Sequence, residues 1–186
     1  EHLAALRVIP NLQVFRPADG VETAECWELA VASGDAPSVL ALSRQAVPNL
    51  RKDATAENLS AKGAYVLRPV AKRDVTLIAT GTEVGLAVEA ADMLAKDGIE
   101  AAVVSMPSFE LFRKQPNAYR LEVLGSAPRV AIEAGVAQPW HEWLSDMDTF
   151  VGMSDFGASA PAPKLYEHFG ITAAKVVEAV KAKRKA

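Results

Sequence analysis

The stretch Pro37–Gln45, with the sequence PSVLALSRQ, decides how the first part of this chain folds. Its centre is an unbroken apolar run, Val39–Leu42, which ends abruptly in polar residues. A short apolar run of this kind predicts a strand, Ser38–Leu42, that is buried on both faces in a parallel sheet covered by helices. Arg44 then lies where the strand leaves the sheet, and ligands bind at the carboxyl ends of parallel strands in open α/β folds.

Arg44 allows two interpretations from its position alone. Its guanidinium carries a planar fork of donors that matches a phosphate or carboxylate group, so a strand-end arginine is a candidate anion-binding residue. The structural alternative is that Arg44 pairs with a neighbouring carboxylate or caps the end of a helix. The local pattern leaves both interpretations open.

The residues before this stretch complete a β-α-β pattern. Glu1–Arg7 has the character of a helix end, and Gln13–Phe15 is a short expected strand. Asp19 to Glu22 has the layout of a capping box, in which Asp19 caps a helix and Glu22 reaches back. That helix is expected to end near Ser33. The residues that recur at helical spacing are Val21, Ala24, Trp27 (or Glu28) and Val31. Strand, helix and strand in this order predict a parallel pair.

A polar stretch without periodicity, residues 49–63, separates this pattern from a second one, in which apolar strands alternate with helices. The strands are expected at Tyr65–Leu67, Val75–Ala79, Ala101–Ser105, Arg129–Ile132 and Thr149–Val151. The helices are expected at 83–96, Phe109–Arg113, Asn117–Leu124 and Pro139–Leu144, from Pro161 onward, and from a Thr172 cap to Val180. This alternation predicts an α/β fold with a mostly parallel sheet flanked by helices.

Composition excludes several classes of function. The chain has 186 residues, half of them hydrophobic, and a formal net charge of −3. That charge gives no reason to expect a nucleic acid or an anionic membrane surface as a partner. The sequence contains no apolar run long enough to span a bilayer and no signal-peptide pattern. The single cysteine, Cys26, lies in an apolar helical pattern and is expected to be a buried, unreactive thiol in a reducing compartment.

Two short motifs resemble those of other enzymes but lack their context. The turn Thr80–Glu83 follows a strand, yet it has one glycine where a dinucleotide fingerprint needs three, so a plain tight turn is expected. The triplet Asp155–Gly157 matches a kinase motif, but no other kinase element is present. Both matches are interpreted as coincidental.

No catalytic constellation emerges from the remaining polar residues. The three histidines share no metal-ligand spacing with one another or with Cys26. Glu133, at the end of an expected strand, is the best-placed carboxylate, and an ion pair or a subunit contact is as plausible for it as a ligand. Trp140 and Trp143 are interpreted as packing or interface residues.

Eight strings of residues, in order along the chain, carry a resemblance to a known family. They are LRVIPN, FRPADGVE, LALSRQ, KGAYVL, IATGTEV, VVSMPSFELFRKQ, EAGVAQPWHEW and GMSDFGASAPAPKLYEHFGIT. Together they resemble the C-terminal third of transketolase over essentially the whole chain. VVSMPS with the following F and KQ, and the FGASAP…FG ending, distinguish transketolase from its thiamine-dependent relatives.

The resemblance implies a division of the chain and one site residue. Residues 1–48 would be the C-terminal part of a thiamine-diphosphate pyrimidine-binding domain, 49–63 a linker, and 64–186 the transketolase C-terminal domain. Arg44 is the arginine of the family's LSRQ string, which binds the phosphate of the sugar-phosphate substrate. The family's catalytic, cofactor-binding and metal-binding residues would all lie upstream of Glu1, so none is expected here. His2 falls just after the family's last active-site histidine and is not assigned that role.

The resemblance also implies what the whole protein does. A transketolase is a cytoplasmic homodimer that uses thiamine diphosphate with Mg²⁺ or Ca²⁺. It moves a two-carbon ketol unit from a ketose phosphate to an aldose phosphate, in the pentose phosphate pathway or the Calvin cycle. This chain alone is expected to be inactive and to bind no cofactor without the upstream domains. The alternatives are a stand-alone regulatory or binding module and the C-terminal subunit of a split transketolase.

Overall fold

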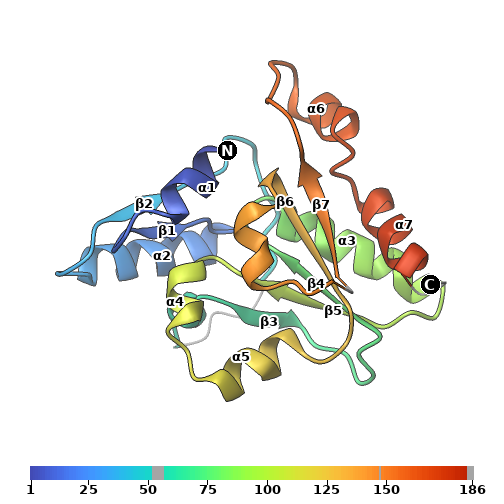
Figure 1. The fold of residues 1–186 in the computed structure, drawn as a ribbon, viewed down its shortest axis with the longest axis horizontal. Coiled ribbons are helices and arrows are strands. Elements are labelled where there is room, and N and C mark those ends of the chain that lie inside the picture. The colour runs from blue at the N-terminus through green and yellow to red at the C-terminus, as the bar shows by residue number, and fades with distance from the viewer. Residues whose placement is uncertain (52–56, 147, 184–186) are drawn as a thin grey trace.

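The computed structural model describes residues 1–51, 57–146 and 148–183. Figure 1 shows them as a small α/β unit, coloured blue, packed against a larger one. Residues 52–56, which belong to the expected linker 49–63, lie outside the described residues. The end of that segment forms a 3₁₀ turn, η1 (Leu59–Lys62), in which Ser60 is buried.

The small unit is the predicted β-α-β arrangement. A short helix, α1 (His2–Arg7), precedes β1 (Gln13–Phe15), and α2 (Gly20–Ala32) connects β1 to β2 (Ser38–Leu40). The two strands are parallel, with Gln13 opposite Ser38 and Phe15 opposite Leu40. The prediction of a parallel pair is therefore confirmed, although β2 ends two residues before Leu42.

The expectation that this strand is buried on both faces is wrong. All three residues of β2 are half-buried, and Leu42 just beyond it is 51% exposed. Among the described residues β2 pairs with β1 alone. A strand with one neighbour has a free edge, and it lacks the second flanking strand that encloses a central strand.

Helix α2 presents to solvent the residues that its sequence pattern marked as its apolar face. Trp27 is 51% exposed and Val31 is 78% exposed, whereas Glu22, Glu25 and Cys26 are buried. Helical spacing of apolar residues ordinarily marks the buried face. Here the buried face is the one that contacts the large unit, where the two carboxylates find hydrogen-bond donors.

The start of α2 differs slightly from the predicted capping box. The Glu22 amide donates to Asp19 Oδ1 over 2.9 Å, as predicted. The Glu22 carboxylate reaches one residue farther back than expected and accepts from the Ala18 amide over 2.7 Å. The helix N-terminus is thus closed by two reciprocal hydrogen bonds.

The large unit confirms the predicted α/β fold with a mostly parallel sheet. Its five strands lie in the order β3-β5-β4-β6-β7, and β3 is antiparallel to its neighbour while all other pairs are parallel. Every residue of the central strands β4 and β5 is buried. The strands are β3 (Tyr65–Arg68), β4 (Val75–Ala79), β5 (Ala101–Ser105), β6 (Arg129–Val136) and β7 (Thr149–Met153).

Helices cover both faces of this sheet. Side chains of successive strand residues point in opposite directions, so the apolar strands present hydrophobic side chains to a helix layer on each face. On one face α3 (Glu83–Lys96) and α7 (Ala173–Lys183) pack on Leu77. On the other face the cluster contains Ile78 and side chains from α4 (Phe109–Arg113), α5 (Asn117–Leu124) and the 3₁₀ turn η2 (Gln138–Glu142). The remaining helix, α6 (Ala162–His168), follows β7.

Several expected details of the large unit are confirmed and others shift. The Thr172 hydroxyl accepts from the Lys175 amide and so caps α7 as predicted. Pro161 stands one residue before α6 rather than at its first position. The predicted helix Pro139–Leu144 is the 3₁₀ turn η2. Trp140 and Trp143 are buried in the core of this face, which confirms their interpretation as packing residues.

Candidate functional site

Arg44 lies four residues beyond Leu40, the last residue of β2, in an exposed loop that runs from residue 41 to residue 51. Within the described residues its guanidinium makes no ion pair or hydrogen bond. The two structural alternatives for Arg44, a carboxylate pair and a helix cap, are therefore not found. The neighbouring Ser43 hydroxyl donates to the Gln45 carbonyl over 2.6 Å and closes a tight turn around Arg44.

The loop that carries Arg44 is held at both ends. At its start the Ala41 amide donates to the Phe15 carbonyl over 2.8 Å, which extends the strand pairing by one bond. At its end the Leu50 and Arg51 amides both donate to Asp19 Oδ2, over 2.9 and 3.1 Å. The loop is thus tied to the helix that follows the neighbouring strand.

The middle of the loop forms one wall of a groove of about 790 Å³. Gln45 to Pro48 face side chains of α3 and of the segment from α6 to the start of α7, among them Leu86, Met93 and Tyr166. The lining is mostly apolar. Sequence reasoning did not predict this groove, because its walls come from segments up to 130 positions apart that no local pattern connects.

Glu133 is part of a buried ion-pair cluster between the two units. Both of its oxygens accept from Arg7, over 2.8 and 2.9 Å, and it also accepts from Arg16 and from the indole N–H of Trp140. Glu133 is 1% exposed. Burial alone favours its neutral form, but the hydrogen bonds and charge of Arg7, helped by Arg16 and Trp140, outweigh burial and lower its pKa. Of the three open interpretations, the structure supports the ion pair.

Arg16 lies against the turn Thr80–Glu83. It donates to the Thr80 carbonyl over 3.0 Å and forms a buried ion pair with Glu83. Its side chain also packs on Gly81, which has a φ of +58°, and a Cβ at Gly81 would lie 2.8 Å from Arg16 Cγ. The glycine therefore serves a tight turn and this close contact.

A second polar cluster joins α2 to the large unit. Glu22 accepts from the hydroxyls of Tyr65 and Ser105 over 2.7 and 2.5 Å, and its complete burial raises its pKa despite these bonds. Glu25 pairs with Arg51 through two hydrogen bonds of 2.7 and 2.8 Å. These contacts explain why carboxylates, and not apolar residues, fill the buried face of α2.

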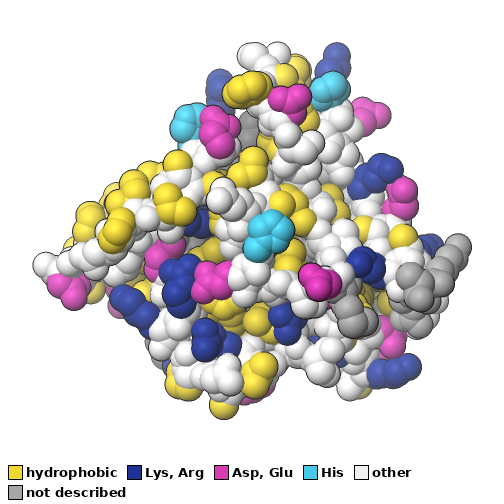
Figure 2. Space-filling model, viewed as in Figure 1, with side chains coloured by type: hydrophobic (Ala, Val, Ile, Leu, Met, Phe, Trp, Pro, Cys, Tyr) yellow, Lys and Arg dark blue, Asp and Glu magenta, His cyan; other side chains and the backbone are white. Residues whose placement is uncertain are grey.

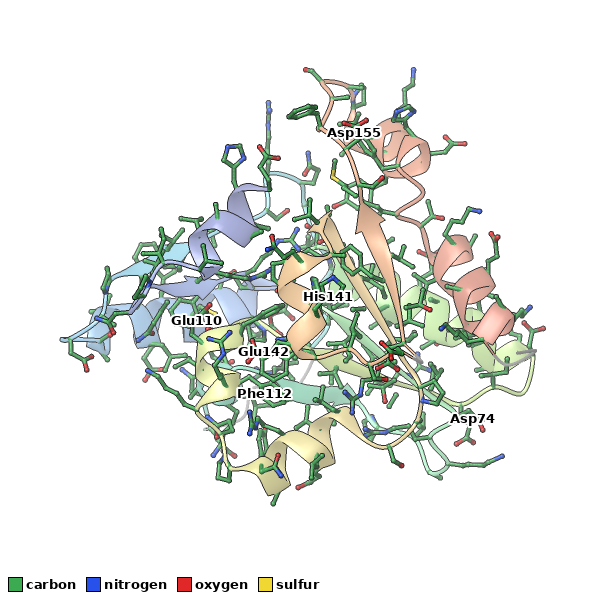
Figure 3. The ribbon with its side chains drawn as sticks, viewed as in Figure 1. Asp74, Glu110, Phe112, His141, Glu142 and Asp155 are labelled. Carbon is green, nitrogen blue, oxygen red and sulfur yellow. The ribbon has the colours of Figure 1, made fainter. Side chains whose placement is uncertain are left out.

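The other residues singled out in the sequence take no part in a site. Cys26 is buried, and burial raises the pKa of its thiol, as expected of an unreactive cysteine. Figure 3 shows Asp155 on the segment between β7 and α6, where Phe156 is 80% exposed. The histidines lie on the surface, and in the described part of the chain no three His, Cys, Asp or Glu side chains are grouped to hold a metal ion. None of the described helices is both long and apolar enough to cross a bilayer.

Sequence reasoning missed Arg7 and Arg16, and it predicted the helix cap of Asp19 but not its hydrogen bonds to the Leu50 and Arg51 amides. Arg16 carries nearly the same signal that singled out Arg44, namely an arginine that follows a short strand. The structure separates the two: Arg16 is buried and paired, whereas Arg44 is exposed and has no partner among the described residues. The signal therefore finds strand-end arginines but does not distinguish a structural one from a ligand-binding one.

Comparisons with known proteins give similarity over the whole chain. Residues 1–49 match the family model described as "Transketolase, pyrimidine binding domain", and residues 63–172 match "Transketolase-like TK C-terminal domain". A transketolase of Cereibacter sphaeroides is 59% identical over 181 residues, which cover 97% of this chain and 28% of that protein. The chain therefore spans a little more than a quarter of the length of this curated relative.

Solved structures give the same result. A transketolase of Pichia stipitis, solved in complex with sedoheptulose 7-phosphate, has a TM-score of 0.89 and 38% identity over 98% of this chain and 26% of its own. A protein described as "Split gene transketolase, inactive beta4 tetramer" has a TM-score of 0.77 and 28% identity. That similarity covers 97% of this chain and 60% of the other chain.

Proposed function

This chain belongs to the transketolase family, and from that premise we propose that it works as part of a thiamine-diphosphate-dependent enzyme. The complete enzyme would move a two-carbon ketol unit from a ketose phosphate to an aldose phosphate. The structural relative that was solved with sedoheptulose 7-phosphate supports a sugar phosphate as the substrate class. We further propose that the complete enzyme is a cytoplasmic homodimer of the pentose phosphate pathway or the Calvin cycle.

The proposed division of the chain places the end of a pyrimidine-binding domain at residues 1–48, a linker at 49–63 and the C-terminal domain at 64–186. Two observations support it. The two sheets share no strand, and the two family models match the chain over residues 1–49 and 63–172. The C-terminal domain contributes a closed core, and no catalytic role is proposed for it.

The role proposed for this chain is phosphate binding by Arg44. One observation carries it: an exposed guanidinium without a partner among the described residues, at the carboxyl end of a parallel strand. A free guanidinium can give a phosphate two charge-assisted hydrogen bonds without first breaking an ion pair. Its contribution to the reaction would be to hold the distal end of the substrate and so position the reacting end.

We propose that the described residues of this chain hold neither the cofactor nor its metal by themselves. The buried carboxylates Glu22, Glu25, Glu83 and Glu133 all accept hydrogen bonds from the chain's own donors. The described residues include no group of metal ligands. We therefore assign no step through the cofactor to this chain, which alone should neither bind thiamine diphosphate nor transfer ketol units. Micromolar binding of the cofactor to the isolated chain, measured by calorimetry, would contradict this.

The test is the substitution Arg44→Ala in the complete enzyme. We expect KM for phosphorylated substrates to rise by about tenfold or more, a loss of about 1.4 kcal/mol or greater in binding. Arg44→Lys should recover part of the affinity, because it restores the charge without the fork of donors. The matched control is Arg68→Ala, which removes an exposed arginine of β3 that pairs with Asp92. An unchanged KM for Arg44→Ala would remove Arg44 from the site.

Two alternatives remain as proposals of lower rank. The similarity to a split-gene transketolase favours a subunit that is active only with a partner polypeptide that carries the upstream domains. The other is a stand-alone binding or regulatory module. The mass of the native polypeptide, determined with an antibody against this chain, distinguishes a segment of a long enzyme from both alternatives. Co-purification of a partner that restores ketol transfer then separates the subunit from the module.

A further inference from the structure

The position of Arg44 depends on a loop of eleven residues, 41–51, whose middle is exposed to solvent. An exposed loop samples many backbone conformations, and a phosphate-binding side chain loses affinity when its backbone moves. Something must therefore fix the two ends of the loop. The start is fixed by strand pairing, since the Ala41 amide donates to the Phe15 carbonyl.

The end of the loop is fixed by Asp19. This carboxylate is 2% exposed, and it accepts three backbone amides from two separate segments. Oδ1 accepts from Glu22 in the first turn of α2, and Oδ2 accepts from Leu50 and Arg51. A helix cap needs only one acceptor. The second oxygen of Asp19 is therefore committed to the loop.

A neighbouring ion pair supports the same point of the chain. The guanidinium of Arg51 forms two hydrogen bonds with Glu25, which lies about one turn of α2 after Glu22. These bonds, with those of the Ser60 amide and hydroxyl, outweigh the effect of burial and lower the pKa of Glu25, so it stays ionised. Asp19 and Glu25 thus hold the backbone and the side chain of one residue, Arg51, against a single helix.

We propose that Asp19 is a positioning residue for substrate binding: its carboxylate fixes the end of the loop 41–51 and thereby places Arg44 to bind the phosphate of the substrate. The inference rests on the proposed role of Arg44 and deepens it. It connects the first turn of α2 to the phosphate end of the substrate through two backbone amides. Asp19 itself does not touch the substrate.

The variant that separates the two roles of Asp19 is Asp19→Ser in the complete enzyme. Serine is a good helix cap, so it keeps the hydrogen bond to the Glu22 amide, but its single, shorter side-chain oxygen does not reach Leu50 and Arg51. We expect KM for a phosphorylated ketose to rise by about threefold or more, because a displaced binding group makes weaker contacts. We expect kcat to stay within about twofold, because Asp19 is remote from the reacting atoms.

Two readouts distinguish positioning from a loss of structure. KM for an acceptor without a phosphate group, such as glycolaldehyde, should be the same in Asp19→Ser and wild type. In an Arg44→Ala background, Asp19→Ser should add no further rise in KM, because both changes remove the same contact. Equal rises in KM for both substrates, or the same rise with and without Arg44, would overturn the proposal.

A measurement on the unaltered enzyme covers the case in which Asp19→Ser does not fold. Hydrogen exchange at the Leu50 and Arg51 amides should be slow compared with that at the amides of residues 43–46, because only the former donate to a buried carboxylate. If the Leu50 and Arg51 amides exchanged as fast as the amides in the middle of the loop, Asp19 would not fix the end of the loop, and the proposal would be contradicted. The single variant Arg44→Ala tests the proposed function separately. An unchanged KM for phosphorylated substrates in that variant rejects the phosphate role of Arg44, whether or not hydrogen exchange shows that Asp19 fixes the end of the loop.

Discussion

The two units of this chain bury their sheets to different degrees. In the large unit, both central strands are wholly buried between two layers of helices. In the small unit, β2 is half-buried, and Trp27 and Val31 of α2 are largely exposed. Figure 2 shows hydrophobic side chains gathered over the part of the small unit where α1 and β2 lie.

This difference shows where each unit obtains its stability. The large unit closes its own core, whereas the small unit has one buried strand, β1, and also packs on the large unit. Some of the contacts between the units are apolar, since Ala18 packs in the core of the large unit. Others are polar: Arg7 and Arg16 reach Glu133 and Glu83, and Glu22 reaches Tyr65. The candidate phosphate-binding residue belongs to the small unit, so its position depends on these contacts as well.

The largest expected effect is that of breaking the ion-pair cluster between the units. Glu133→Gln leaves the charges of Arg7 and Arg16 incompletely paired in a buried site, which should lower the free energy of unfolding by about 3–5 kcal/mol. The matched control is Glu142→Gln, which breaks the ion pair with Arg113 near the surface (Figure 3), where both side chains are more than a third exposed. Its cost should be about 0–1 kcal/mol. If urea denaturation gave the same loss of unfolding free energy for Glu133→Gln and Glu142→Gln, the stability of the two units would not depend on the buried ion-pair cluster.

A core substitution compares the two units directly. Leu77 on β4 is fully buried, so Leu77→Ala should cost about 2–5 kcal/mol through lost burial and the cavity that remains. The same change at Leu42, just after β2, should cost less than about 1 kcal/mol, because that side chain is 51% exposed. Denaturation of the two variants side by side measures the difference. A cost at Leu42 that matches Leu77 would mean that the small unit has a closed core after all.

The smallest expected effect is a pH dependence with opposite signs at two carboxylates. Because the pKa of Glu133 is lowered from its ordinary 4.5, its contribution to stability is present above pH 4.5 and is lost as the pH falls through the lowered pKa. The pKa of Glu22 is raised by burial, so its contribution is favourable below pH 4.5 and is lost as the pH rises through the raised pKa.

Denaturation curves that extend from pH 7 to well below pH 4.5 check both signs. The gap in stability between wild type and Glu133→Gln should narrow as the pH falls. The stability of Glu22→Gln relative to wild type should increase as the pH rises, since glutamine stays neutral. Parallel pH profiles for wild type and either variant would contradict the corresponding assignment.

The sequence predicted most of the fold because the relevant signals are local. The apolar run Val75–Ala79, the Asp19 cap and the Thr172 cap each act within a few residues, and each is found where it was expected. The resemblance to transketolase is likewise confirmed by relatives over the whole chain. The predictions from local sequence patterns thus agree with the structure at this buried strand and at these two helix caps.

The predictions that were wrong concern contacts between distant segments. Helical spacing marked Trp27 and Val31 as the inner face of α2, but both are exposed. The buried Glu22 bonds instead to Tyr65 and Ser105, which are 43 and 83 positions from it. The pair of Arg7 with Glu133 spans 126 positions. No periodicity within a segment records such a partner, so the ion-pair clusters and the anchoring role of Asp19 emerge only from the structure.

The central claim is that Arg44 binds the phosphate of the substrate. The most direct test is a crystal structure of the complete enzyme with a phosphorylated ketose bound. The expected result is that guanidinium nitrogens of Arg44 lie about 2.7–2.9 Å from phosphate oxygens, the distance of a charge-assisted hydrogen bond, with the Leu50 and Arg51 amides still on Asp19. A phosphate bound by other residues, with Arg44 pointing into solvent, would contradict it.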